Sequence, residues 1–175
     1  MSLYSVKALL LLDTDGKRLF AKYYADAPAD QAGFEQKLTT KASKANGDIT
    51  VFEGRTVLYK RMGDVMLFIL ADEDENECML YNLLVGIRDS LEGLLEHAVD
   101  RQAVLTYYDR VVLLLDEAVD SGIVLETDPQ VLISRVTKVA EDSSVPSVDL
   151  SERGIRNMFD FAKGRLTQAV RNQFQ

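Results

Sequence analysis

Several features that would point to secretion or membrane insertion are rare in this sequence or missing from it. The single cysteine, Cys78, cannot form an internal disulfide, which favours a reducing compartment. No apolar run reaches the roughly 20 residues that a membrane-spanning helix needs. The N-terminus also lacks the basic flank and the small-residue cleavage site of a signal peptide. These absences predict a cytosolic protein.

The motifs of nucleotide, metal and catalytic sites are missing as well. The glycines stand singly, without the spacing of a phosphate-binding loop. Cys78 and the one histidine, His97, are expected about 28 Å apart along one helix, which is too far for a catalytic pair. One cysteine and one histidine are also too few ligands for a zinc site. The acidic run at residues 72–77 lacks the pattern of a calcium loop and suits the positive start of a helix. We therefore expect no enzyme activity, no catalytic residue, no cofactor and no metal.

Basic residues are outnumbered, with 20 Lys and Arg against 28 Asp and Glu and a net charge of −8 at pH 7. Nucleic acid and anionic membranes would repel such a surface, so any membrane association is expected to come through a partner. The charge is unevenly spread, because residues 141–175 hold five acids and five bases. The whole acidic surplus therefore lies in residues 1–140.

The composition is that of a globular protein, because 47% of the 175 residues are hydrophobic. Strands are predicted at residues 5–12, 18–24, 49–52, 55–62 and 65–71, and the first of them is expected at the centre of the sheet because it is apolar without strict alternation. Turn pairs such as Asp15-Gly16 and Glu53-Gly54 join antiparallel neighbours. Helices are predicted at residues 34–45, 78–97, 104–122 and 129–139.

The helix predicted at residues 104–122 carries more apolar surface than one contact requires, since a single packed face needs a stripe of only about 100°. Its central stripe is formed by Val104, Tyr108, Val111, Leu115, Ala118 and Val119. Two interpretations stay open: the helix is wedged between its own sheet and its own neighbouring helix, or it meets another chain. In the second case Tyr107, Leu113 and Leu114 are the expected partner-interface residues.

The C-terminal part is expected to be separate from the domain. Residues 141–148 are polar and interrupted by Pro146, which is typical of a linker. Asp149 and Glu152 then resemble a capping box at the start of a helix. The predicted organisation is a domain at residues 1–140, a linker at 141–148 and a C-terminal helix at 149–175.

The order of these elements is that of a longin-like domain. The segments LLLDTDGKRLFAKYY, FEGRTVLYK, ENECMLYNLL and LLDEAVDSGIVLETDPQ resemble the small subunits of adaptor complexes, and particularly their zeta branch in coatomer. Positions shared with the clathrin adaptor small chains are Leu115, Asp116, Glu117, Gly122, Glu126 and Thr127. The resemblance spans residues 5 to about 140. It implies an α+β fold: a longin-like (SNARE-like) domain whose five-stranded antiparallel sheet has helices on both faces, with a C-terminal helical tail.

The resemblance also implies a function. The zeta branch is a non-catalytic small subunit of the heteroheptameric coatomer (COPI) coat, packed against the trunk of the gamma subunit, in Golgi-to-ER and intra-Golgi vesicle transport. Membrane association would be peripheral, on the cytosolic face of Golgi membranes and vesicles, through the complex and a small GTPase. The alternatives are a clathrin-adaptor-type chain that helps to bind dileucine cargo signals, and a longin domain that regulates a SNARE or a small GTPase. A SNARE would need a heptad motif and a membrane anchor after residue 140, and the sequence shows neither.

Overall fold

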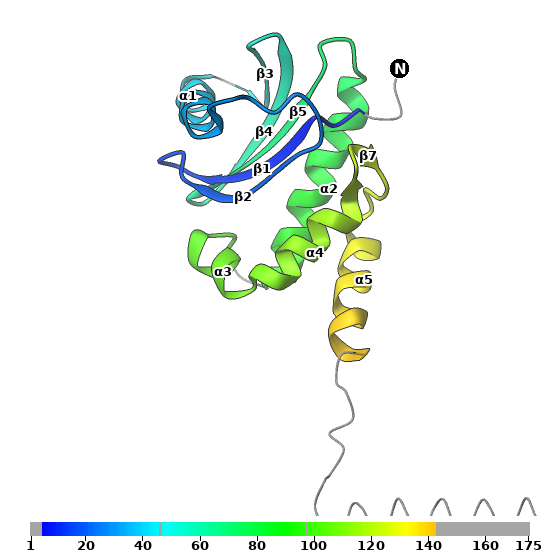
Figure 1. The fold of residues 1–175 in the computed structure, drawn as a ribbon. Helices are drawn as coiled ribbons and strands as arrows, with labels where there is room; N and C mark the ends of the chain where they lie inside the picture. Colours follow the sequence, from blue (N-terminus) through cyan, green and yellow to red (C-terminus); the bar gives the residue numbers. More distant parts are fainter. Residues whose placement is uncertain (1–4, 46, 97, 143–175) are drawn as a thin grey trace, which may run out of the picture. The chain divides into compact units, whose positions relative to one another are not determined.

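The computed structural model describes residues 5–45, 47–96 and 98–142, and its framework is a five-stranded antiparallel sheet (Figure 1). Hydrogen-bonded neighbours follow the order β2-β1-β5-β4-β3. The strands are β1 (Ala8–Asp13), β2 (Arg18–Tyr23), β3 (Ile49–Phe52), β4 (Arg55–Met62) and β5 (Val65–Ala71). The predicted antiparallel sheet is confirmed, and the last three strands have the predicted bounds.

The sequence predicts the first strand at the centre of the sheet, but the central strand is β5. Strand β1 lies beside it, and both strands are buried along their whole length. Two interior strands covered on both faces carry the same continuous apolar pattern, so that pattern does not distinguish them. The turns follow the sequence: Gly16 has φ +78°, while Glu53 and Gly54 have φ +50° and +70°, the two positive angles of a tight hairpin.

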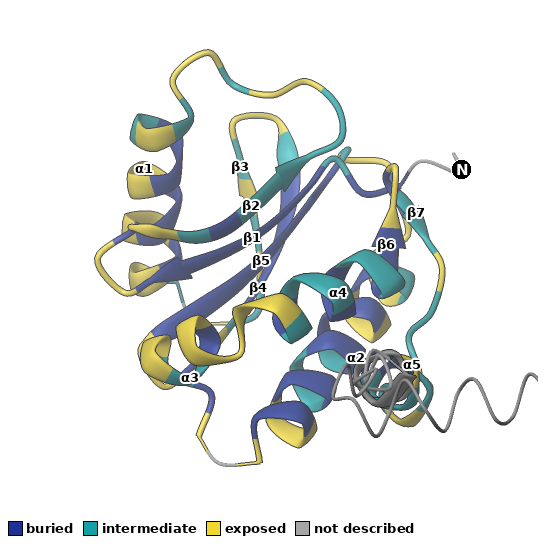
Figure 2. Cartoon of the chain, turned by 60° about the horizontal axis from the view of Figure 1, so that its bottom comes forward, coloured by how far each residue is buried: buried dark blue, intermediate teal, exposed yellow. Residues whose placement is uncertain are grey.

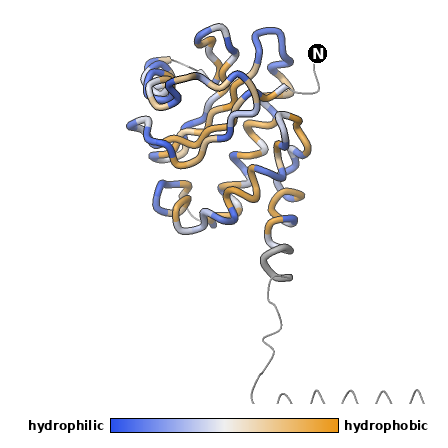
Figure 3. The backbone as a smooth tube through the Cα atoms, in the orientation of Figure 1, coloured by the Kyte–Doolittle hydropathy of each residue, from blue (hydrophilic) through white to orange (hydrophobic). Residues whose placement is uncertain are grey.

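Helices cover both faces of the sheet, as predicted. Helix α1 (Gln31–Lys44) buries Phe34, Leu38 and Ala42 against one face. Helix α2 (Glu77–Leu95) covers the other face with a leucine-rich stripe. The leucines of this stripe belong to the larger of the two hydrophobic clusters. Figure 3 shows the strands between these layers as largely hydrophobic. The larger cluster also contains residues from all the later helices, so these helices belong to the core on the second face of the sheet.

The acidic run before α2 has a mixed role. Asn76 caps the helix, because its side-chain oxygen accepts hydrogen bonds from the N–H groups of Cys78 at 3.0 Å and Met79 at 3.2 Å. Glu77 lies in the first turn, where the helix dipole favours it. Asp72 instead pairs with Lys7 at 3.0 Å and connects the loop to the start of β1.

After α2 the chain forms α3 (Arg101–Thr106), α4 (Tyr108–Ala118), a two-stranded hairpin of β6 (Val119–Asp120) and β7 (Ile123–Val124), and α5 (Pro129–Asp142). The described residues end with α5, which therefore includes the first two positions of the predicted linker. The rest of that linker and the predicted helix at 149–175 lie outside the described residues.

A buried carboxylate fastens α1 to the edge of the sheet. Glu35 is 2% exposed and accepts hydrogen bonds from Arg18 Nη2 at 2.6 Å and from the Tyr23 hydroxyl at 2.7 Å. Burial, followed by the hydrogen bond to Glu35, raises the pKa of the Tyr23 phenol. Burial, with the nearby charge of Asp116, likewise raises the pKa of Tyr24, whose hydroxyl donates to the carbonyl of Val119 at 3.2 Å.

These two tyrosines predict a loss of stability at alkaline pH. The unfolded chain releases their protons near pH 10 while the folded chain retains them, so the free energy of unfolding falls as the pH rises above about 10. Urea unfolding at about pH 8 and about pH 10.5 measures the fall. The double variant Tyr23→Phe with Tyr24→Phe should reduce the fall, whereas Tyr81→Phe on exposed α2 surface should leave it unchanged. An equal decline in both variants would assign the alkaline loss to other groups.

Candidate partner-binding surface

The helix predicted at residues 104–122 is two helices with a break at Tyr107. Tyr107 has φ −109° and ψ +34°, donates its N–H to the carbonyl of Ala103 and accepts the N–H of Val111, each at 3.0 Å. It therefore closes α3 and opens α4. The break falls in Thr106-Tyr107-Tyr108, three residues of weak helix propensity. Asp100 caps the start of α3 by accepting from the N–H of Ala103 at 2.7 Å.

On α4 the predicted stripe is buried at Val111, Leu115 and Ala118, and the buried face is wider than predicted. Helix α4 buries Val111, Leu114, Leu115 and Ala118 at the spacing of one helical face. The assignment of Leu114 to a partner interface is therefore wrong, because the side chain is 0% exposed within its own core. Tyr108, predicted in the central stripe, is instead 41% exposed. Leu113 is half-buried against the core.

Exposed apolar side chains gather at the junction of the two helices, which Figure 2 shows as an exposed corner. Leu105 is 50% exposed and Tyr107 is 42% exposed, beside Tyr108. We call these three residues the corner cluster. The guanidinium of Arg110 lies 5.8 Å from the centre of the Tyr107 ring, within the range of a cation–π contact. The sequence indicated Tyr107 but missed Leu105 and Tyr108, since both were placed on a straight helix.

The predicted helix end at Ser121-Gly122 is a hairpin turn. Both residues have positive φ, +51° and +82°, as the tight turn between β6 and β7 requires. A Cβ on Gly122 would lie 2.6 Å from the carbonyl oxygen of Val6. The N–H of Val6 also donates to the carbonyl of Gly122 at 3.0 Å. The hairpin is therefore fixed to the segment before β1.

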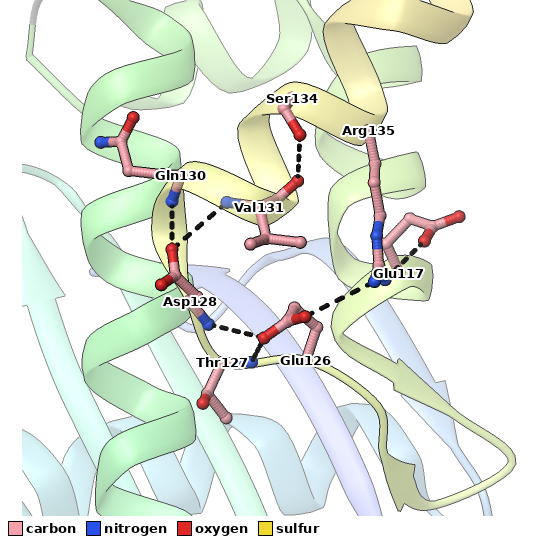
Figure 4. Close-up of polar contacts among 8 residues, drawn as sticks. All are labelled: Glu117, Glu126, Thr127, Asp128, Gln130, Val131, Ser134 and Arg135. Carbon is pink, nitrogen blue, oxygen red and sulfur yellow. Dashed lines mark hydrogen bonds and ion pairs between the residues drawn. The ribbon is translucent and has the colours of Figure 1, made fainter.

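Three of the positions shared with the adaptor small chains, Glu117, Glu126 and Thr127, lie together in Figure 4 and take part in contacts between elements of the domain. Arg135 of α5 pairs with Glu117 at 3.3 Å and with Glu126 at 3.5 Å. Glu126 also accepts the backbone N–H groups of Thr127 at 2.9 Å and Asp128 at 3.0 Å, and these two hydrogen bonds lower its pKa. Asp128 in turn caps α5 by accepting the N–H of Gln130 at 2.8 Å.

Two further contacts extend these connections to α2 and the sheet. Gly86 lies so close to the segment before α5 that an added Cβ would be 2.2 Å from the carbonyl oxygen of Thr127. Asp116 of α4 pairs with Lys22 of β2 at 2.6 Å. These contacts thus hold α4, the hairpin and α5 in place.

Other kinds of site have little support in the described part of the chain. It contains no group of three or more His, Cys, Asp and Glu side chains placed to hold a metal ion. Cys78 is exposed at the second position of α2, while His97 lies outside the described residues. No helix among the residues searched is both long and apolar enough to span a membrane. Three open hollows in the described part of the chain adjoin the polar side of α1.

Comparisons with known proteins agree on one group. The family described as clathrin adaptor complex small chain matches residues 5–143. Coatomer subunit zeta-1 of Homo sapiens is 38% identical, with 94% of this chain and 92% of the relative covered. Coatomer subunit zeta of Saccharomyces cerevisiae is 33% identical over 97% and 96%, and coatomer subunit zeta-1 of Arabidopsis thaliana is 37% identical over 94% and 96%.

A similar fold occurs in a chain of a homology model of the full-length AP-3 complex in a stretched open conformation. The TM-score is 0.64 at 17% identity, and the match covers 79% of this chain and 95% of that chain. At this identity the likeness concerns the fold: the antiparallel sheet with helices on both faces.

Proposed function

Because this chain belongs to the clathrin adaptor complex small chain family, in its coatomer zeta branch, we propose that it packs against the gamma-subunit trunk of a COPI coat through the corner cluster. Its relatives are coat subunits, so the chain is a small subunit of a vesicle coat, and a non-catalytic role fits that family. The identity of the large partner, the binding surface and the transport step are the parts that we propose.

The observation that supports this surface is the clustering of three exposed apolar side chains on one corner of the domain. Leu105, Tyr107 and Tyr108 fall within four consecutive positions and are each exposed by 41% or more. Tyrosines and clustered apolar side chains are typical centres of protein interfaces. Leu113 remains in the proposed contact as a half-buried neighbour on α4, whereas Leu114 does not.

The location follows from the assembly. The chain would stay at the cytosolic face of Golgi membranes and vesicles through the heteroheptameric coat and its small GTPase, in Golgi-to-ER and intra-Golgi transport. Its net charge of −8 supports an indirect membrane association, because an anionic membrane surface would repel the isolated chain.

Removing the corner cluster should weaken gamma binding without unfolding the domain. The variant Leu105→Ala with Tyr107→Ala is expected to raise the dissociation constant for gamma about a hundredfold, since a few central residues dominate most interfaces. Calorimetric titration of gamma trunk with each purified variant measures this change. The matched control is Leu125→Ala, which removes a side chain that is 53% exposed but lies beyond β7.

The melting temperature of the double variant should stay close to that of the parent, because both side chains are largely in water already. Equal loss of binding in the Leu125→Ala control would move the interface to the hairpin side. Parent-like binding by the double variant would refute the corner cluster as the contact.

A further inference from the structure

From the open edge of β3 we infer a second docking surface, which pairs with an extended apolar segment of a partner coat subunit by strand addition. This inference rests on the assembly proposed above but uses a different part of the molecule. Strand β3 is the outermost strand on one side of the sheet (Figure 1), and among the described strands it pairs only with β4. The opposite edge is better covered, because α3 packs against β2 and Lys22 pairs with α4.

The backbone of β3 presents hydrogen-bonding groups outward at two positions. The carbonyl of Asp48 accepts the N–H of Tyr59 at 2.8 Å, so these residues form a hydrogen-bonded pair. In an antiparallel ladder such pairs alternate, which turns Thr50 and Phe52 toward β4 and the peptide groups of Ile49 and Val51 away from it. Lys41 Nζ donates to the carbonyl of Val51, which agrees with this outward direction.

The same two residues expose apolar side chains. Ile49 is 41% exposed and Val51 is 52% exposed, on the face of the sheet that α2 covers. Helix α2 packs mainly on β4 and β5, and the exposure of Ile49 and Val51 shows that it leaves these two side chains largely uncovered. An added strand would bury both side chains and pair the outward backbone groups in one step.

The strand lacks most of the devices that protect free edges. Its register with β4 is continuous over four residues, and it contains no proline and no internal charge. The side chain of Lys41 reaches the edge, where it also lies 5.5 Å from the centre of the Phe52 ring. A backbone N–H of an incoming strand would replace this ammonium at the Val51 carbonyl.

Charge decides between possible occupants. A second copy of this chain would bring together two molecules of net charge −8, which disfavours a symmetric pairing of two β3 edges. Asp48, at the start of the strand, is neutralised by an ion pair with Lys60 at 2.6 Å, so the edge itself carries little net charge. The alternately exposed side chains and the net charge of the chain therefore fit an extended segment of another chain, apolar at alternate positions and without a net negative charge.

Hydrogen exchange resolved by residue tests the inference on the chain alone and on the chain co-expressed with the gamma trunk. In the isolated chain the amides of Ile49 and Val51 should exchange at least about tenfold faster than those of Thr50 and Phe52. In the complex, exchange at Ile49 and Val51 should slow by about a hundredfold. Fast exchange that persists at both positions in an intact complex would overturn the inference and leave the proposed function standing.

A pair of variants at one position separates the backbone from the side chain. Val51→Pro removes the outward N–H and leaves the ladder to β4 intact, so it should weaken the complex about tenfold. Val51→Thr keeps that N–H and should change the affinity less than about threefold. If both variants melt like the parent and bind equally, the edge is not paired.

The remaining outcomes are distinct. If no complex with gamma forms, the proposed function and this inference fail together. If Ile49 and Val51 become protected only when the isolated chain dimerises, the occupant is a second copy and the assignment to a partner subunit is wrong.

Discussion

Leu114→Ala is expected to lower the free energy of unfolding by about 2 to 5 kcal/mol, the usual cost of emptying a buried leucine site. The side chain is fully buried in the cluster that joins α4 to α2 and the sheet, so its removal leaves a cavity that rigid neighbours cannot fill. Urea unfolding of the purified chain measures the change. Leu115→Ala, equally buried on the same face, should cost a similar amount.

The matched control is Leu105→Ala, which removes the same number of atoms from a side chain that is 50% exposed. Its effect on the free energy of unfolding should stay within about 0.5 kcal/mol, as for most surface substitutions. A Leu114→Ala variant that is as stable as the parent yet binds gamma poorly would return Leu114 to the partner interface and show that the break at Tyr107 is absent in solution.

Gly86→Ala should destabilise the domain by about 1 to 3 kcal/mol, although alanine favours a helix interior. The new Cβ would lie 2.2 Å from the carbonyl oxygen of Thr127 and 3.0 Å from its carbonyl carbon. Both atoms belong to the backbone of Thr127, and the N–H of the same residue donates to the Glu126 carboxylate at 2.9 Å. Helix α2 and the start of α5 would therefore have to separate, which disturbs the packing between them.

Gly93→Ala provides the control on the same helix. Its Cβ would lie 2.7 Å from the Cδ1 atom of Ile133, the free end of a side chain that can rotate away. We expect this variant to be neutral or slightly more stable in the same urea titration, because the gain in helix propensity offsets the contact. If Gly93→Ala were the less stable of the two variants, the backbone of residues 126–128 would move more easily than the Ile133 side chain.

Local chemistry made most of the sheet predictable. Glu53-Gly54 lies between two stretches of strand character, and a two-residue link with positive φ leaves an antiparallel hairpin as the simple solution. The stripe of α2 was equally clear, because its leucines repeat at the helical period without interruption. The position of β1 was less certain, since burial on both faces does not tell a central strand from its neighbour.

The proposed partner-binding surface was harder to predict because it depends on a single backbone angle. At Tyr107 a ψ of +34° replaces a helical value and changes the rotation of every later side chain. Propensity alone does not decide between a straight and a broken helix there, since the cost of weak helix formers is a few tenths of a kcal/mol each. Gly122 posed a related ambiguity, because a glycine after an apolar stretch suits a helix end and a hairpin turn equally well.

The position of β1 between β2 and β5 has a consequence for the chain as it leaves the ribosome. Asp13 pairs with Val65, so about fifty residues must be synthesised before the inner edge of β1 finds its partner, which takes several seconds at usual translation speeds. During that interval the hairpin of β1 and β2 presents five apolar residues, from Ala8 to Leu12, that are all buried in the finished domain. The nascent chain is therefore expected to be a chaperone client until β5 emerges, and a stalled ribosome carrying residues 1–60 should recruit chaperones more strongly than one carrying the whole domain.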